Sequence, residues 1–214
     1  MKYKIIMSNI KRSGLLLVLS SPSGAGKSSI SRAILAEDEN IMLSVSATTR
    51  SMRESEVEGI DYNFYTKDKF QSMIDKNQFI EYAKVFDNYY GTPARPVLDA
   101  LDEGTDVMFD VDWQGGQILA NKFTHDIVKI FILPPSISEL ENRLKKRAQD
   151  SNEVIKMRMK KSEVEISHWN EYDWVIINRD FKESVEKVKS IIQSERLKKN
   201  RQSGLVDFVG NLCS

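Results

Sequence analysis

The stretch LSSPSGAGKSS, residues 19–29, constrains the fold of this chain more than any other part of it. A continuous apolar run at residues 15–19 leads into it, and a helical pattern of apolar residues follows it. A buried strand, a glycine-rich turn and a helix form the context in which backbone N–H groups wrap a phosphate. We therefore predict a strand at 15–19, a phosphate-binding loop at 20–26 and a helix at 27–36.

One position departs from the usual phosphate-loop pattern G-x-x-x-x-G-K-[ST], because Ser21 stands where the first glycine is expected. Gly26, Lys27 and Ser28 match the pattern, and Gly24 adds a glycine inside the loop. Lys27 can reach the outer phosphates of a nucleotide, and the Ser28 hydroxyl can ligate Mg²⁺. We expect Ser21 to have a negative φ, which residues other than glycine readily adopt.

The rest of the chain alternates between the two kinds of regular structure. Further continuous apolar runs stand at residues 107–111, 128–133 and 174–177, and helical patterns lie between and after them, at 136–147, 153–167 and 181–197. Buried strands that alternate with helices predict an α/β fold with a mostly parallel sheet, in the three-layer arrangement of P-loop proteins.

Two segments break this alternation. Residues 45–101 are rich in Tyr, Asn, Asp, Thr and Arg, and they predict a small mixed α/β subdomain inserted in the core. Residues 142–167 are heavily charged, which predicts a solvated helical lid. The core then comprises 14–44, 102–141 and 168–200, with tails at 1–13 and 201–214. The last tail has too few apolar residues for its own core, and we expect it to fray or to pack on a neighbour.

Composition excludes several classes of protein. The chain has 214 residues, and its 31 Lys and Arg balance its 31 Asp and Glu, so no global bias toward nucleic acid or membrane surfaces exists. The first apolar run is shorter than the roughly 7–15 residues of a signal-peptide core and the roughly 20 of a membrane helix. The one cysteine, Cys213, cannot form an internal disulfide. We predict a cytoplasmic protein without nucleic-acid or membrane partners.

Two aspartates follow the apolar run at 107–111. Asp110 and Asp112 are two positions apart and point to the same face of a strand end, where a ligand of a Mg²⁺-bound water belongs in a P-loop enzyme. The alternative is a loop-capping aspartate. The D-x-x-G of Asp112 to Gly115 also matches a GTPase switch, but the only Asn-Lys pair, NKFT at 121–124, has threonine where the guanine motif N-K-x-D needs aspartate.

Candidate phosphate and base ligands lie in the inserted segment. Arg50 and Arg53 are close in sequence, and arginine guanidinium groups bind phosphate oxygens in a bidentate way. A carboxylate such as Glu81 could accept from the N1–H and 2-amino groups of guanine, which adenine lacks. In the charged segment, Arg143 and Arg147 share a helical face, and an exposed charged helix is the alternative to a role on a transferring phosphoryl group.

Together these elements resemble guanylate kinase, from about Gly14 to Leu197. The resemblance rests on SPSGAGKSS, SVSATTRSMRESEVEGIDYNF, FIEYAKVFDNYYGTP, MFDVDWQGG and FILPPSISELENRLKKR, of which the second is the most specific. It implies a P-loop core, a GMP-binding insertion and a mobile lid. It also implies reversible, Mg²⁺-dependent transfer of the γ-phosphoryl group of ATP to GMP or dGMP in purine nucleotide metabolism.

The resemblance also assigns residues by position. Donor binding falls on Ser23, Gly24, Ala25, Gly26, Lys27, Ser28, Ser29 and Asn178. The GMP phosphate falls on Arg50, Arg53, Tyr62 and Tyr90, and guanine on Ser46, Glu81, Thr92 and Asp110. Catalysis falls on Lys27, Arg143, Arg147 and Arg158, and Mg²⁺ on Ser28 and, through water, on Asp112.

Two other functions remain as alternatives at this point. Guanylate-kinase-like domains of scaffolding proteins bind peptides, but they typically lose the P-loop lysine or the lid arginines, which are present here. A P-loop kinase for AMP or dTMP is the second alternative, and Glu81 and Ser46 argue against it. ATP and GMP are the expected small-molecule partners, and the sequence leaves monomer and homodimer open.

Overall fold

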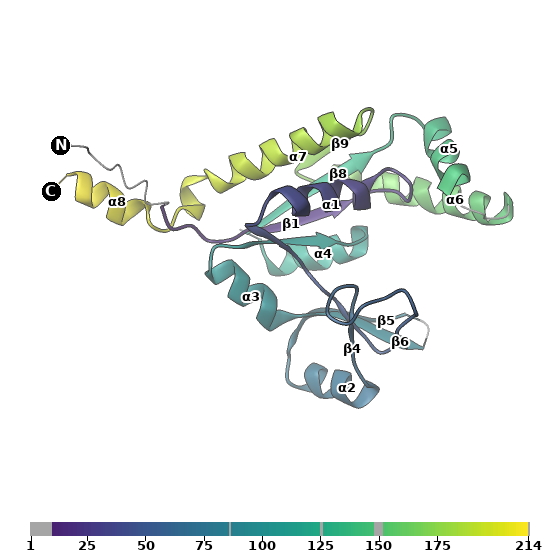
Figure 1. Ribbon diagram of the computed structural model, residues 1–214, viewed down its shortest axis with the longest axis horizontal. Helices are drawn as coiled ribbons and strands as arrows, with labels where there is room; N and C mark the ends of the chain where they lie inside the picture. The colour runs from purple at the N-terminus through teal and green to yellow at the C-terminus, as the bar shows by residue number, and fades with distance from the viewer. Residues whose placement is uncertain (1–9, 86, 125, 148–151, 214) are drawn as a thin grey trace.

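The computed structural model describes residues 10–85, 87–124, 126–147 and 152–213, and within these the side chains of Val85, Lys146, Arg147 and residues 152–154 lie outside the description. A parallel sheet with helices on both faces forms the main body (Figure 1). Its strands, in spatial order, are β2 (Ile41–Leu43), β7 (Asp106–Asp110), β1 (Leu16–Ser20), β8 (Ile127–Leu133) and β9 (Trp174–Ile177). Every pairing is parallel. The predicted α/β fold is confirmed.

The two faces of this sheet are covered by different helices. Leu17 and Leu19 of β1 pack with α1 (Lys27–Glu37) and α7 (Phe181–Arg196), whereas Leu16 and Val18 pack with α3 (Ala94–Asp102) and α4 (Trp113–Lys122). Side chains alternate across a strand, so a strand covered on both faces must be apolar at every position. This is why β1 reads as an unbroken apolar run, and all of its residues are buried.

A second, smaller sheet lies below the main sheet in Figure 1. It is mixed, in the order β4 (Asn63–Phe64), β3 (Ala47–Thr48), β6 (Asn88–Pro93) and β5 (Phe79–Val85). Helix α2 (Lys67–Asp75) packs against it, and Phe70 stacks on Phe79 with 4.3 Å between ring centroids. Ile80 of β5 belongs to the core cluster of the main sheet, so this strand joins the two parts.

Helix α3 shows where the inserted segment returns to the core. All of its residues but the last, Asp102, fall in the segment 45–101 that the sequence groups with the insertion, but Val97 and Ala100 pack with Val18 and Phe109 of the main sheet. The polar insertion is therefore followed by a helix that covers one face of the main sheet.

The charged segment forms two helices at one end of the molecule (Figure 1). These are α5 (Ile137–Arg147) and α6 (Asn152–Ser167), and the short helix η1 (Trp169–Glu171) follows. The end of α6 is held on the core, because the His168 ring stacks on Trp113 of α4 with centroids 3.6 Å apart. Among the described residues, no helix is long and apolar enough to cross a membrane.

The C-terminal tail forms a helix, so of the two expected outcomes, fraying and packing on a neighbour, fraying is not observed. After the short helix η2 (Lys199–Arg201), residues Leu205–Leu212 form helix α8, which points away from the main body (Figure 1). None of its residues is buried, and Val206 and Leu212 are 80% and 70% exposed. Helical structure therefore forms here without a core of its own.

Candidate active site

The loop after β1 has the backbone of a phosphate loop. Gly24 and Gly26 have φ values of 93° and 106°, a region that glycine adopts without strain. Among the described residues, only Asn77 combines a side chain with a positive φ. Ser21 therefore has the negative φ expected of it, and the missing first glycine does not distort the turn. Gly26 leads directly into α1, so the loop N–H groups and the positive end of this helix lie together.

Asn178 supports this loop from the protein interior. Its side chain is buried, its Nδ2 donates to the Ala25 carbonyl over 2.7 Å, and its Oδ1 accepts from the Ser184 hydroxyl over 3.0 Å. A Cβ at Gly26 would lie 2.5 Å from Asn178 Nδ2. The structure thus places the amide of Asn178 beneath the loop, and the close approach explains why residue 26 must be glycine.

A cavity of about 240 Å³ opens above the loop. Residues of the loop, of the start of α1, of the end of β7 and of α6 line it: Ser21, Pro22, Ser23, Gly24, Gly26, Lys27, Ser28, Asp110, Asp112 and Glu165. Lys27 Nζ forms an ion pair with Asp110 and donates to the Val111 carbonyl over 3.2 Å. Of the remaining predicted donor residues, Ala25 is buried and Ser29 is exposed on the first turn of α1.

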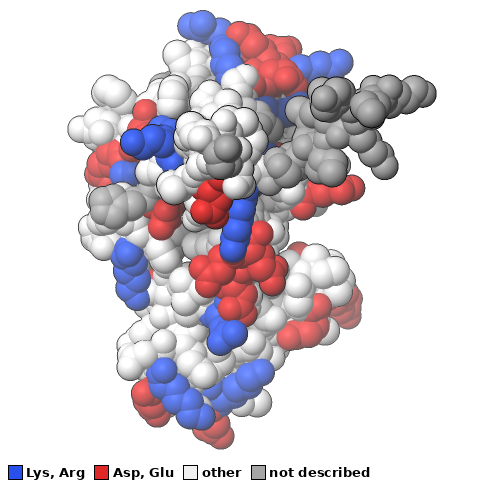
Figure 2. All heavy atoms as spheres, turned by 90° about the vertical axis from the view of Figure 1, so that its left-hand side faces the viewer, with Lys and Arg blue, Asp and Glu red and all other residues white. Residues whose placement is uncertain are grey.

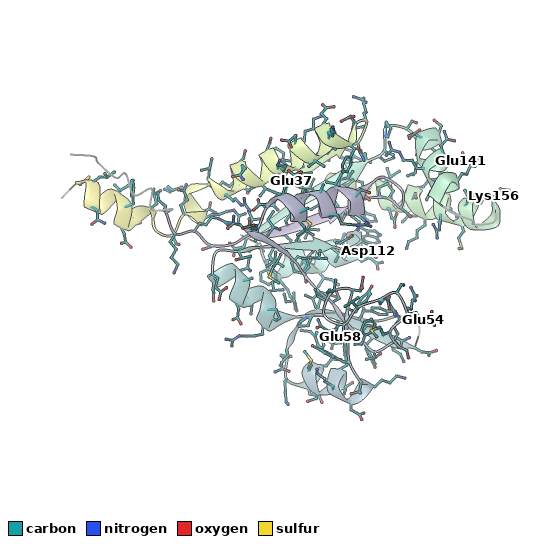
Figure 3. The ribbon with its side chains drawn as sticks, viewed as in Figure 1. Glu37, Glu54, Glu58, Asp112, Glu141 and Lys156 are labelled. Atoms are coloured by element: carbon teal, nitrogen blue, oxygen red, sulfur yellow. The ribbon has the colours of Figure 1, made fainter. Side chains whose placement is uncertain are left out.

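Asp110 and Asp112 lie where β7 ends, beside the phosphate loop. Asp110 is opposite Leu19 in the parallel pairing of β7 with β1, so both strands deliver their carboxyl ends to one edge. Asp112 accepts a hydrogen bond from Gly115 N over 3.0 Å and caps α4. Figure 3 shows Asp112 on the side of the core that faces the inserted subdomain with Glu54 and Glu58.

A second cavity, of about 300 Å³, adjoins the first at Asp110. Three predicted GMP ligands belong to its wall, which consists of Leu43, Ser44, Ser46, Ile60, Asp61, Tyr62, Phe109, Asp110 and Val111. These residues come from the end of β7, from the end of β2 and the segment after it, and from the loop that leads into β4. The Asp110 carboxylate therefore belongs to both cavities, one lined by predicted donor-binding residues and the other by predicted GMP-binding residues.

Three of the four predicted acceptor-phosphate residues, Arg50, Tyr62 and Tyr90, lie together, and the fourth, Arg53, is exposed. The Arg50 guanidinium lies 5.1 Å from the centroid of the Tyr62 ring, and the Tyr90 ring meets the Tyr62 ring edge-on at 6.1 Å. Arg50 forms a bidentate pair with Glu56, in which Nη1 donates to Oε2 over 2.7 Å. The hydrogen bond from Arg50, helped by the Arg53 backbone N–H, lowers the pKa of Glu56 to about 2.

Glu81 and Thr92 face each other on β5 and β6. The Thr92 hydroxyl donates to Glu81 Oε1 over 2.8 Å, and Thr92 is fully buried. Burial raises the pKa of the Glu81 carboxyl, and the hydrogen bond from Thr92 opposes this shift. A half-desolvated carboxylate with a fixed neighbour is suited to recognise a pair of N–H donors on a base.

Of the three arginines of the charged segment, Arg143 and Arg158 have different surroundings. Arg143 of α5 pairs with Glu139 over 2.8 Å and reaches the Ala25 and Asn178 carbonyls over 3.5 and 3.4 Å. It therefore lies against the phosphate loop. Arg158 is exposed on α6, and the side chain of Arg147 lies outside the described residues.

Two site residues were not foreseen from the sequence. Glu56 holds Arg50, and Glu165 of α6 accepts from Ser23 N over 3.1 Å. Both stand in segments with many charges, where spacing does not say which carboxylate turns inward. The pattern RSMRESEVEG shows that acids lie near Arg50 and Arg53, but not that one of them is their partner.

The residues at the loop fit a magnesium ion. Mg²⁺ binds oxygen ligands and is usually held by one or two carboxylates together with substrate phosphates and waters. The Ser28 hydroxyl and the Asp110 and Asp112 carboxylates line the same cavity and supply oxygen atoms of this kind.

A parallel α/β core, a phosphate loop after its first central strand and an adjoining second ligand cavity define a P-loop nucleoside monophosphate kinase. Comparisons identify the particular family. The family model described as guanylate kinase matches residues 13–195. The chain therefore belongs to the guanylate kinase family, whose reaction is phosphoryl transfer from ATP to GMP.

Individual relatives agree with this assignment. The chain is 53% identical to the guanylate kinase of Paramagnetospirillum magneticum over 206 residues, which cover 96% of each chain. It is 54% identical to that of Cereibacter sphaeroides, over 94% of this chain and 96% of the relative. The crystal structure of guanylate kinase from Anaplasma phagocytophilum superposes with a TM-score of 0.73 at 36% identity, covering 94% and 96% of the two chains.

Proposed function

We propose that the triphosphate of ATP binds in the cavity above the phosphate loop and that GMP binds in the second cavity. The single observation that carries this proposal is that the two cavities meet at Asp110, whose carboxylate pairs with Lys27. A donor on one side and an acceptor on the other would bring their phosphates together beside the Lys27 ammonium. The expected products are ADP and GDP.

Catalysis in this arrangement depends on position and charge. The GMP phosphate is the nucleophile, and Arg50, Arg53, Tyr62 and Tyr90 would hold it in line with the γ-phosphorus of ATP. Phosphoryl transfer needs little covalent help, so alignment and neutralisation of the charge on the transferred group supply most of the rate. Lys27 would neutralise that charge from the loop, and Arg143, Arg147 and Arg158 would do so from the lid.

Ser28, and Asp112 through a water molecule, would hold Mg²⁺, and the bound ion would neutralise charge on the phosphate oxygens. Closure of α5 and α6 over the donor would exclude water, which would otherwise receive the phosphoryl group. In the acceptor site, Ser46, Glu81, Thr92 and Asp110 would select guanine, because the Glu81 carboxylate would remain unpaired opposite adenine.

We infer a cytoplasmic enzyme of purine nucleotide metabolism that has no nucleic-acid or membrane partner. The equal numbers of basic and acidic residues support this, and Figure 2 shows both signs of charge interspersed over one face. The enzyme would also accept dGMP if none of its residues contacts the ribose 2′-hydroxyl of GMP. Monomer and homodimer are the two candidate states, and light scattering distinguishes them.

Lys27→Ala tests the assignment of the donor site. We expect kcat for GDP formation to fall by about 10²-fold or more, because a charge-stabilising group at the transferred phosphoryl is lost. Steady-state kinetics with ATP and GMP measure this. Lys187→Ala, on the exposed surface of α7, serves as the control and should keep kcat. A Lys27→Ala variant with normal kcat would contradict the proposal.

A further inference from the structure

The phosphate loop carries an internal carboxylate. Ser23 N donates to Glu165 Oε2 over 3.1 Å, although Ser23 and Glu165 are 142 positions apart in the chain. Glu165 stands near the end of α6, and its side chain is only 13% exposed. Backbone N–H groups of such loops are the donors that bind phosphate oxygens. A carboxylate oxygen therefore occupies one of the positions that suits a phosphate oxygen.

The charges around this cavity leave Glu165 positioned to repel an incoming anion. Of the described residues, the carboxylates of Asp110, Asp112 and Glu165 line the cavity together with one cation, Lys27, whose ammonium already pairs with Asp110. Lys161 Nζ lies 3.9 Å from Glu165 Oε1, but the Lys161 side chain is 72% exposed, so water screens this pair. Among the described residues Lys161 is the cation that pairs with Glu165, and because it is exposed, Glu165 brings a poorly compensated negative charge to the cavity wall.

Asp110 and Asp112 differ from Glu165 in what holds them. Asp112 accepts from Gly115 N and caps α4, and Asp110 pairs with the Lys27 side chain, so in the described contacts neither carboxylate accepts from a backbone N–H of the phosphate loop. The contact from Glu165 goes instead to a loop N–H. Its loss would leave the carboxylate free to turn toward solvent or toward Lys161, at low cost.

We propose that Glu165 is an internal competitor of the donor phosphates, which occupies the phosphate loop in the nucleotide-free protein and leaves it when the donor binds. The proposal rests on the assignment of this loop to the ATP phosphates. Because Glu165 belongs to α6 and Arg143 of α5 also contacts the loop backbone, both helices of the proposed lid respond to whether the loop is filled. Displacement of Glu165 would therefore couple donor binding to a change in α6.

The test compares Glu165→Gln with Glu163→Gln. The two residues lie on the same helix and both substitutions remove one negative charge, but Glu163 is exposed and does not line the cavity. Isothermal titration with ATP and Mg²⁺, without GMP, measures the donor Kd. We expect Glu165→Gln to bind ATP about 3- to 10-fold more tightly, the range for removal of a competing charged hydrogen-bond acceptor. Glu163→Gln should bind ATP as the wild type does.

Titration with GMP in the same variants is the second measurement, and its Kd should not change in either. Tripolyphosphate, which has no base or sugar, should also bind Glu165→Gln more tightly. Unchanged or weaker ATP binding by a folded Glu165→Gln variant would overturn the inference while leaving the proposed function intact. If Glu165→Gln does not fold, Glu165→Ala and Glu165→Asp serve instead. Glu165→Ala should then bind ATP more tightly than the wild type does. A wild-type protein that binds GMP but no ATP would overturn both proposals.

Discussion

At the scale of single residues, three aspartates on and after β7 have three different environments. Asp106 is fully buried at the start of the strand and holds Arg12, Arg196 and the backbone N–H of Leu15. Asp110 at the end of the strand pairs with Lys27, and Asp112 caps α4. The spacing of Asp110 and Asp112 predicted their common edge. The spacing could not tell which of the two binds a ligand and which caps a helix. Nothing in the pattern distinguished the structural role of Asp106.

Glu81→Gln tests guanine recognition at this scale. Because burial raises the pKa of Glu81 above its ordinary value of 4.5, its ionised form is disfavoured by folding. That cost is present above the raised pKa and absent below 4.5. At neutral pH the glutamine variant should therefore be at least as stable as the wild type, while kcat/KM for GMP falls by about 10²-fold.

Thermal unfolding without nucleotide and steady-state kinetics with GMP and AMP check the two parts of this prediction. The Gln side chain keeps an acceptor for the Thr92 hydroxyl, so the contact between β5 and β6 should persist. Glu103→Gln, at the exposed end of α3, controls for the loss of one charge. A variant that keeps full selectivity for GMP over AMP would remove Glu81 from the recognition site.

At the scale of elements, long periodic segments were predictable and short or glycine-containing ones were not. The runs at 15–19, 107–111, 128–133 and 174–177 became four strands of the main sheet, each within one residue of its expected bounds. Helix α4 was missed, because WQGGQILANK contains two poor helix formers. Its glycines allow close packing instead: a Cβ at Gly116 would lie 3.4 Å from Val18 Cγ1 and 3.2 Å from the Tyr172 hydroxyl.

Arg143→Ala tests the proposed lid as an element. Arg143 is the described arginine of α5 that contacts the loop, and its loss should lower kcat by about 10²-fold, as expected for a cation at the transferring group. Lys145→Ala on the same helix removes a charge that pairs with Glu141, so its kcat should stay near the wild-type value. Figure 3 shows Glu141 on α5, on the end of the molecule that carries the lid. Equal effects of the two substitutions would assign only a surface role to Arg143.

At the scale of the whole molecule, the site is built from three parts that the chain visits in turn. Carboxyl ends of parallel strands meet at one edge, so the proximity of the phosphate loop and Asp110 followed from the order of strands and helices. The partners of Glu56 and Glu165 did not follow from it. They depend on how the insertion and α6 are oriented against the core, which side-chain spacing within one segment does not determine.

Substrate preference tests the central claim most directly. Parallel assays measure ADP formation by the wild-type protein from ATP and Mg²⁺, each with one acceptor: GMP, AMP or dTMP. The two adjoining cavities and the Glu81 carboxylate predict rapid turnover with GMP and turnover lower by at least about 10²-fold with the other two. Turnover with AMP or dTMP that equals or exceeds turnover with GMP would contradict the account.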